Sequence, residues 1–156
     1  MRTIRRATAK DIPEIDDLLN QVNLVHHLGR PDLFKRARKY TDEQLAELLV
    51  DDSRPVFVAA DENDRAVGYV FCIFQRHVGD NILTDVKTLY IDDLCVQERL
   101  RGRHVGRALF DYTLAFAREQ GCHNVTLNVW SLNPGAQKFY EKCGMKPLKI
   151  GMETLL

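Results

Sequence analysis

The sequence predicts an α+β or α/β fold, built on a mixed sheet of six or seven strands that is flanked by about four helices. Two observations predict this class. Early apolar runs are spaced for antiparallel hairpins, and later strand and helix patterns alternate, which favours parallel pairing where a helix crosses over. A length of 156 residues fits one compact domain covering residues 1–156.

The first third of the chain predicts one strand and two helices. The strand is expected over 3–8. Asp11 and an early proline then open a helix whose apolar residues recur at helical spacing. The segment 24–40 has little periodicity and is expected to be a loop with a helical turn. A short second helix follows over 41–50, with a threonine cap.

The rest of the chain predicts strands first and then an alternation. Two β-branched and aromatic runs, 56–60 and 66–74, flank an acidic turn and predict an antiparallel hairpin. The elements expected after it are a strand over 86–96, a helix from Val105 to near Gly121, a strand over 125–130, a helix over 133–143 and a last strand over 148–155.

Composition limits the partners of this chain. Lys+Arg and Asp+Glu are balanced at 22 each, so no global field attracts nucleic acid. The apolar runs are shorter than the roughly 20 residues that span a bilayer, and the first residues lack a secretory signal. The four cysteines form no CxxC pair. We therefore expect a cytoplasmic protein with no metal, membrane or nucleic-acid partner.

The strongest chemical signal is an arginine-rich loop between a strand that ends at Val96 and a helix that begins at Val105. Free backbone N–H groups and the helix dipole make such a junction an anion site, and Arg101, Arg103 and Arg107 add cations. The loop lacks the Gly-Lys-Ser/Thr ending of a nucleotide P-loop and the three glycines of a dinucleotide fingerprint. A different phosphate-bearing ligand is therefore expected.

The loop resembles the coenzyme A loop of the GNAT superfamily of N-acetyltransferases. The family pattern has Arg or Gln at its first position and Gly or Ala at the two later ones. This chain has Arg101 at the first position and His104 and Gly106 at the other two. His104 departs from the pattern, so either the loop is reshaped or this side chain points outward and meets a phosphate. The residues that the resemblance assigns to the coenzyme are Leu94, Cys95, Val96, Arg101, Gly102, Arg103, His104, Val105, Gly106, Arg107 and Asn133.

A second motif of the same superfamily follows in the right order. It consists of Asn133, Ala136, Phe139, Tyr140 and Gly144-Met145. Asn133 before Pro134 is explained by a helix N-cap, by a contact to the pantetheine arm, or by both. The resemblance covers about the C-terminal half of the chain.

The resemblance implies acetyl transfer from acetyl-CoA to a primary amine by direct attack in a ternary complex. In this superfamily the fourth and fifth strands run parallel and splay apart, and pantetheine lies along the free edge of the fourth, here Leu94, Cys95 and Val96. A backbone N–H near Leu94 would then polarise the thioester carbonyl. The resemblance also allows a homodimer, although no interface is apparent in the sequence.

Three residues are candidates for proton transfer. Tyr140 is expected to protonate the departing thiolate, unless it is only an aromatic core residue. An amine with a pKa near ~10 must lose a proton before it attacks, and Asp92 and Asp93 are the candidate bases. Adjacent strand residues face opposite ways unless a bulge intervenes. Asp92 is favoured as base or amine anchor and Asp93 is second, while a purely structural role for either stays open.

The acceptor site is less well defined. We expect it between segment 26–40 and a hairpin near Arg76-His77, with Asp32 and Glu43 as further cation partners and Trp130 in the core. The alternatives are a non-catalytic acyl-CoA sensor, which would need neither Tyr140 nor the acidic pair, and a nucleotide- or nucleic-acid-binding domain.

Overall fold

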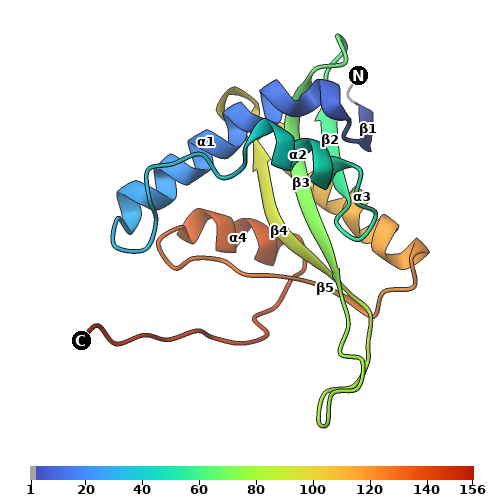
Figure 1. The fold of residues 1–156 in the computed structure, drawn as a ribbon, viewed down its shortest axis with the longest axis vertical. Helices are drawn as coiled ribbons and strands as arrows, with labels where there is room; N and C mark the ends of the chain where they lie inside the picture. Colours follow the sequence, from blue (N-terminus) through green and yellow to red (C-terminus); the bar gives the residue numbers. More distant parts are fainter. Residues whose placement is uncertain (1–2) are drawn as a thin grey trace.

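The computed structural model describes residues 3–156, so residues 1 and 2 of the expected domain lie outside it. It shows a twisted central sheet with helices on both faces (Figure 1). The elements are β1 (Thr3–Arg6), η1 (Ala9–Asp11), α1 (Ile12–Gly29), α2 (Asp42–Leu49), β2 (Val56–Ala60), β3 (Ala66–Gln75), β4 (Thr88–Val96), η2 (Glu98–Leu100), α3 (Val105–Glu119), β5 (Asn124–Leu127) and α4 (Pro134–Lys142).

The strands follow the order β1-β2-β3-β4-β5. The first three pairings are antiparallel, as hairpin connections require, and β4 pairs with β5 in parallel across the α3 crossover. This mixed arrangement confirms the predicted fold class.

Each face of the sheet has its own hydrophobic core. All five residues of β2 are buried because alternate side chains enter opposite layers. Val56 and Val58 pack with α1 and α2, whereas Phe57 and Ala59 pack with α3. Figure 1 shows α1 and α2 in front of the sheet and α3 behind it. These two cores fix β4, which carries the candidate acids.

Local signals explain the first two helices. Thr41 and Gln44 form the expected capping box, in which each backbone N–H donates to the other side chain at 3.1 and 2.9 Å. Helix α1 continues to Gly29, so residues 24–29 are helical and the loop expectation is wrong there. A Cβ at Gly29 would lie 3.3 Å from the Leu132 side chain, so a small residue lets this helix end pack beside the segment after β5.

The sheet in the described part of the chain has five strands, not the expected six or seven. The last expected strand, 148–155, is extended, but its backbone makes no hydrogen bond to another element. A strand is defined by its partner, and the apolar alternation of this segment does not provide one. The segment leaves the body of the protein after α4 (Figure 1).

Among residues 3–156, no helix has both the length and the apolarity needed to cross a bilayer. The same residues contain no group of three or more His, Cys, Asp or Glu side chains arranged to hold a metal ion. All four cysteines are free thiols.

Candidate active site

A cleft opens where β4 and β5 separate. Their pairing runs from Thr88 with Asn124 to Ile91 with Leu127, and β4 then continues to Val96 with no partner on that side among residues 3–156. The resulting cleft has a volume of about 2360 Å³. A pocket for one drug-sized ligand measures roughly 300–1,000 Å³, so this cleft has room for two substrates. The expected splayed pair of parallel strands is present.

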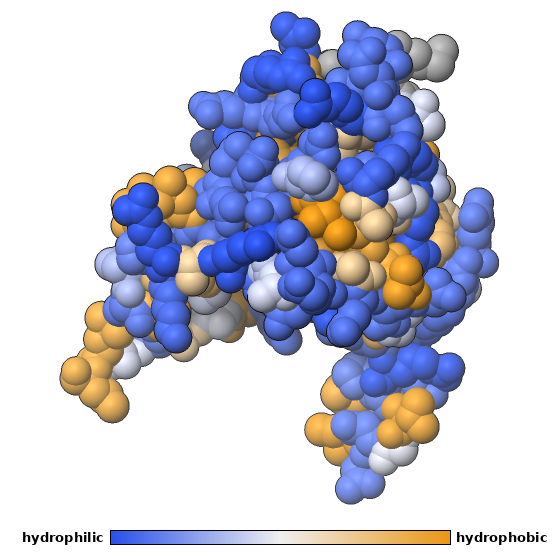
Figure 2. All heavy atoms as spheres, turned by 45° about the horizontal axis from the view of Figure 1, so that its top comes forward, coloured by the Kyte–Doolittle hydropathy of each residue, from blue (hydrophilic) through white to orange (hydrophobic). Residues whose placement is uncertain are grey.

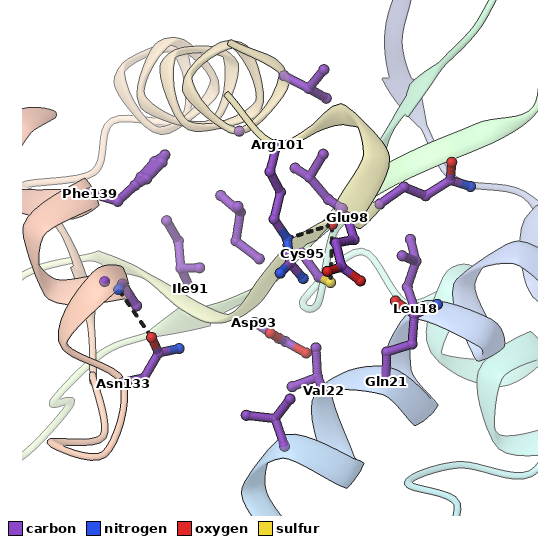
Figure 3. A pocket seen from close by; sticks show the side chains of 18 of the residues that line it. Leu18, Gln21, Val22, Ile91, Asp93, Cys95, Glu98, Arg101, Asn133 and Phe139 are labelled. Atoms are coloured by element: carbon purple, nitrogen blue, oxygen red, sulfur yellow. Dashed lines mark hydrogen bonds between the residues drawn. The ribbon is translucent and has the colours of Figure 1, made fainter. Parts of the chain in front are cut away.

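Three elements form the walls of the cleft. Figure 3 shows Leu18, Gln21 and Val22 of α1 on one side, Asn133 and Phe139 on the other, and Asp93 pointing from β4 into the space between them. Two walls of the cleft are therefore helices, and its floor is a strand fixed by both hydrophobic cores. Side chains on these elements are held rigidly.

A β-bulge brings both acidic side chains to the cleft. Phe71 of β3 pairs with Asp93 and the next residue, Cys72, pairs with Ile91, so Asp92 has no partner across the ladder. The bulge removes the strict alternation of sides, and both carboxylates line the cleft. The bulge that would allow the two acids to share one site is therefore present.

Asp93 is enclosed by the cleft walls and receives one strong hydrogen bond. The buried Tyr69 hydroxyl donates to Asp93 Oδ2 at 2.6 Å. Burial raises the pKa of Asp93, and the Tyr69 hydrogen bond and the Lys39 charge oppose this only in part. A carboxylate with a raised pKa holds a proton more readily near neutral pH than an ordinary aspartate does.

Asp92 lies nearer the surface and is paired with a cation. Lys39 Nζ lies 3.2 Å from Asp92 Oδ2. Burial alone would lower the pKa of Lys39, but the charges of Asp92, Tyr40 and Asp93 outweigh it, and the net pKa is raised. The chain therefore holds an ammonium group of its own beside the acidic pair.

Tyr140 reaches the cleft from α4. Its ring packs against Phe139 at 5.1 Å and Phe110 at 6.1 Å between ring centroids, and its hydroxyl makes no hydrogen bond within residues 3–156. Burial, followed by the charge of Asp93, raises the pKa of Tyr140. The phenol therefore stays protonated at neutral pH and can donate a proton.

The free edge of β4 presents backbone amides to the cleft. Gln97 N–H donates to Val67 O of β3 at 2.9 Å. Successive residues of a strand direct their N–H groups to opposite sides, so the amides of Leu94 and Val96 point away from β3, toward the gap. The backbone amide of Cys95 points the other way, toward β3, while its side chain lines the cleft. Burial and the Asp93 charge raise the pKa of its thiol to about 11, which makes it a poor nucleophile.

The loop before α3 leaves its helix N-terminus open. His104 is the N-cap residue, yet its side chain makes no capping hydrogen bond, so the first amides of α3 keep no side-chain partner. The exposed His104 has φ 64°, the left-handed conformation that glycine adopts most readily. The loop therefore keeps a glycine-like backbone course at this position.

The remaining loop residues differ in position. Arg101 Nε donates to Val96 O at 3.4 Å and so links the loop to the β4 edge (Figure 3). A Cβ at Gly106 would lie 3.3 Å from the Phe139 ring, so this glycine lets α3 and α4 approach closely. Gly102, Val105 and Arg107 also line the cleft, whereas Arg103 lies outside its lining.

Asn133 caps α4 as predicted. Its Oδ1 accepts the Ala136 N–H at 3.2 Å, and Pro134 occupies the first helical position. Asn133 also lines the cleft. The capping role is present, and the pantetheine contact remains a prediction.

An aromatic cluster lies at one end of the cleft. The Phe34 ring lies 4.8 Å from His26 and 5.1 Å from Trp130, between ring centroids. Trp130 is 45% exposed and lines the cleft, so the core assignment is wrong. Burial lowers the pKa of His26, which favours a neutral imidazole. These rings form an apolar surface in the same cleft as the acidic pair.

Residues 22–145 match the family described as the acetyltransferase (GNAT) family. The chain belongs to this family. The match includes β4, α4 and the loop that precedes α3. It therefore includes every candidate catalytic residue of this GNAT protein.

Known relatives agree with this assignment. An Arabidopsis thaliana glucosamine 6-phosphate N-acetyltransferase is 33% identical over 66 residues, which make up 42% of each chain. An uncharacterised N-acetyltransferase of Methanocaldococcus jannaschii is 26% identical over 95% of this chain and 62% of its own length. The chain thus spans about half the length of these curated relatives. A crystal structure of a mutant Bacillus halodurans protein superposes with a TM-score of 0.94 and 28% identity, covering 99% of both chains.

The acceptor end of this GNAT protein differs from expectation. Arg76 and His77 lie outside the cleft lining, and Arg76 Nη2 pairs with Asp85 Oδ2 at 2.7 Å across its own loop. Asp32 pairs with Arg30 at 2.8 Å, and neither Asp32 nor Glu43 lines the cleft. Asp32 and Glu43 are predicted from charge and Arg76-His77 from the expected position of a hairpin, and neither criterion shows where the loops run.

Sequence reasoning missed several residues of the site. Tyr69 and Lys39 contact the two acids, and Glu14 and Asp17 of α1 also line the cleft. Tyr69 pairs with Cys95, so it is a diagonal neighbour of Asp93 on the same face of the sheet. That signal becomes visible only once the register of β3 and β4 is known.

Proposed function

We propose that this GNAT protein transfers an acetyl group from acetyl-CoA to a primary amine by direct attack in a ternary complex. The observation that carries the proposal is the convergence of Asp92, Asp93 and Tyr140 on one cleft beside the free amides of β4. A base, an acid and a hydrogen-bond donor for a carbonyl are the three groups that amine acylation requires.

The residues present fit a coenzyme A group. The uncapped amides at the start of α3 suit a pyrophosphate, and Arg101 and Arg107 add positive charge. The outward amides of Leu94 and Val96 suit the amide-bearing pantetheine arm, with Asn133 on the opposite wall. When bound, acetyl-CoA would supply the acetyl thioester.

Asp93 is the better proton acceptor of the two acids, although the sequence favoured Asp92. Its raised pKa lies closer to neutral pH, and its single donor, Tyr69, leaves the other carboxylate oxygen free to take the proton of the incoming ammonium. Asp92 already holds an ammonium at 3.2 Å in the form of Lys39. We therefore assign Asp93 as the base and Asp92 as the amine anchor.

Tyr140 is assigned as the acid. Its raised pKa keeps the hydroxyl protonated, and that hydroxyl has no hydrogen bond with the described residues to break before it donates. It would pass its proton to the sulfur that leaves the acetyl group. The acid is carried by α4 and the base by β4, and both line the cleft, so each can face a different substrate.

The acceptor is assigned to the class of primary amines. The position beside Asp92 already accommodates an ammonium group, and the rings of Phe34 and Trp130 offer an apolar surface in the same cleft. The similarity to a glucosamine 6-phosphate N-acetyltransferase supports an amine acceptor, over 42% of the chain. The natural amine is to be found by screening.

The test combines binding and turnover. Calorimetric titration with acetyl-CoA is followed by a thiol-release assay against a panel of primary amines. We expect Tyr140→Phe to bind acetyl-CoA normally and to lose about 10²–10⁴-fold in kcat. Tyr112→Phe, on α3 and outside the cleft lining, is the matched control and should keep full activity.

Two results would contradict the proposal. Absence of acetyl-CoA binding would remove the transferase assignment. Full activity of Tyr140→Phe would remove Tyr140 as the acid. Binding without turnover across the whole panel would favour the acyl-CoA sensor instead.

A further inference from the structure

Lys39 places an ammonium group inside the cleft that the proposed function assigns to two substrates. Its Nζ donates to Asp92 Oδ2 at 3.2 Å, and its side chain is 34% exposed. The charge of Asp93 also acts on this group, so the ammonium lies within electrostatic reach of both acids. The position beside the amine anchor is therefore occupied by a primary amine of the chain itself.

The segment 30–41, which carries this lysine, is bonded to α1. His27 Nδ1 lies 2.8 Å from Phe34 O, and Arg38 Nε donates to Asp16 Oδ1 at 2.8 Å. Figure 1 shows the segment turning back at the end of α1 and running beside that helix to α2. Since α1 forms one wall of the cleft, these contacts hold the segment at the cleft.

Tyr40 fixes the lysine side chain from the other side. Its ring stacks on Phe71, with the centroids 6.2 Å apart and the planes inclined by 20°, and Phe71 pairs with Asp93 at the bulge. Lys39 Nζ lies over the Tyr40 ring, 5.4 Å from its centroid, which is within the range of a cation–π contact. The ammonium is thus held between a ring face and a carboxylate.

Lys35 provides the contrast within the same segment. It also lines the cleft, yet it is exposed and forms no ion pair among residues 3–156. Figure 2 shows a largely hydrophilic surface, on which a solvated lysine is the ordinary case. The contact with the acidic pair, rather than exposure, distinguishes Lys39.

We propose that Lys39 is a self-acetylation site, at which the protein transfers an acetyl group from acetyl-CoA to its own Nζ when no external amine occupies the cleft. The proposal rests on the proposed function, because it uses the same acetyl donor, base and acid. Acetylation removes the positive charge of a lysine, so the modified chain would no longer hold Lys39 on Asp92.

The step balances with the groups already assigned. Asp93 takes one proton from the Lys39 ammonium, and the nitrogen then bonds to the carbonyl carbon of the thioester. The carbon–sulfur bond breaks, and Tyr140 protonates the departing thiolate. The second proton lost by the nitrogen replaces the one that Tyr140 gave, and the proton on Asp93 passes to solvent. The products are acetyl-lysine, the free thiol of coenzyme A and one proton.

The test follows a labelled acetyl group. The protein is treated with a lysine deacetylase, so that Lys39 starts as a free amine, and is then incubated with acetyl-CoA that carries a deuterated acetyl group. No external amine is added, and the peptides are analysed by mass spectrometry. We expect the label on Lys39 at a rate independent of protein concentration, as an intramolecular step requires. Lys35 is the internal control and should show only slow, non-enzymatic labelling.

Two variants connect the labelling to the active site. Tyr140→Phe should lower the rate of labelling at Lys39 by about 10²–10⁴-fold. Tyr112→Phe, outside the cleft lining, is the matched control and should keep the rate of the unaltered protein. Labelling of Lys39 no faster than that of Lys35, or unchanged by Tyr140→Phe, would overturn the proposal.

The amine panel separates this proposal from the proposed function. Turnover of an external amine with Lys39 unlabelled would overturn self-acetylation and leave the transferase assignment in place. Absence of both turnover and labelling would contradict the two together.

Discussion

Two aspartates in this protein are enclosed by the fold and differ in how their charge is balanced. Asp11, at the start of α1, is 2% exposed and accepts hydrogen bonds from Arg5 at 2.8 and 2.9 Å and from Thr8 N–H at 2.9 Å. Asp93, in the cleft, accepts one hydrogen bond from the neutral Tyr69 hydroxyl. The nearest cation to the acidic pair, Lys39, is bonded to Asp92 instead.

The difference separates a structural carboxylate from a reactive one. Burial alone would raise the pKa of Asp11, but the Arg5 and Thr8 hydrogen bonds outweigh it, and the pKa is lowered. Burial dominates at Asp93, and its pKa is raised. A buried carboxylate with incomplete compensation destabilises the fold slightly and gains the ability to take a proton.

Removing the cation from the structural pair should have the largest effect on stability. Arg5→Met leaves the buried Asp11 charge without its ion pair and should lower the free energy of unfolding by about 3–5 kcal/mol. Arg38→Met removes an exposed arginine paired with Asp16 and should leave the free energy of unfolding almost unchanged. Chemical denaturation measures both. Equal losses in the free energy of unfolding of the two variants would contradict the distinction between the buried and the exposed ion pair.

The Tyr69 hydrogen bond should set the pH dependence of turnover. Tyr69→Phe removes a donor to the Asp93 carboxylate, a hydrogen bond that holds the pKa of Asp93 down, so this pKa should rise further. The acidic limb of the kcat/KM profile should move to higher pH with it. Tyr90→Phe, which removes only a contact to Asn128, should leave the limb in place. An unmoved limb in Tyr69→Phe would indicate Asp92 as the base.

The two carboxylates should give stability profiles of opposite sign. The lowered pKa of Asp11 stabilises the fold above the ordinary value near ~3.9, and this contribution is lost as pH falls through the lower folded value. The raised pKa of Asp93 does the reverse, since stability falls as pH rises from ~3.9 through the folded value.

Unfolding measured between pH 2 and pH 8 tests this pair. Relative to the unaltered protein, Asp93→Asn should gain stability as pH rises, and Asp11→Asn should lose it. Parallel curves for the two variants would show that the two sites are electrostatically alike.

The smallest effect is expected at the edge of the site. Lys39→Met removes a partly exposed pair with Asp92 and should change the free energy of unfolding by less than about 1 kcal/mol. It should also lower the KM for amine acceptors, because Lys39 no longer occupies the position beside Asp92. A raised KM would show that Lys39 helps the acceptor to bind.

Caps and turns could be predicted from the sequence because they depend on residues close to one another in the chain. The Thr41 and Gln44 capping box, the Asn133 cap and the hairpin of β2 and β3 are specified by neighbouring residues. Residue pattern also located the arginine-rich loop and the acidic pair. The structure places both acids and the arginine-rich loop, apart from Arg103, in the cleft lining.

Features that depend on distant pairing could not be predicted in the same way. The bulge at Asp92 and the Tyr69 contact to Asp93 both depend on the register between β3 and β4, which are joined by the long loop 76–87. Trp130 joins the cleft only because the end of α1 packs beside its loop. Segment 146–156 has the alternation of a strand, yet among residues 3–156 its backbone pairs with no strand of the sheet.

The gap between β4 and β5 also gives the protein an internal reporter of occupancy. The amides of Leu94 and Val96 point into the gap, so in the free protein they should exchange with deuterium quickly, although the strand that carries them is rigid. A ligand that accepts hydrogen bonds along this edge would slow exchange at these two amides and leave Cys95, bonded to β3, unchanged. Mass spectrometry of this one peptide would reveal binding before any product forms.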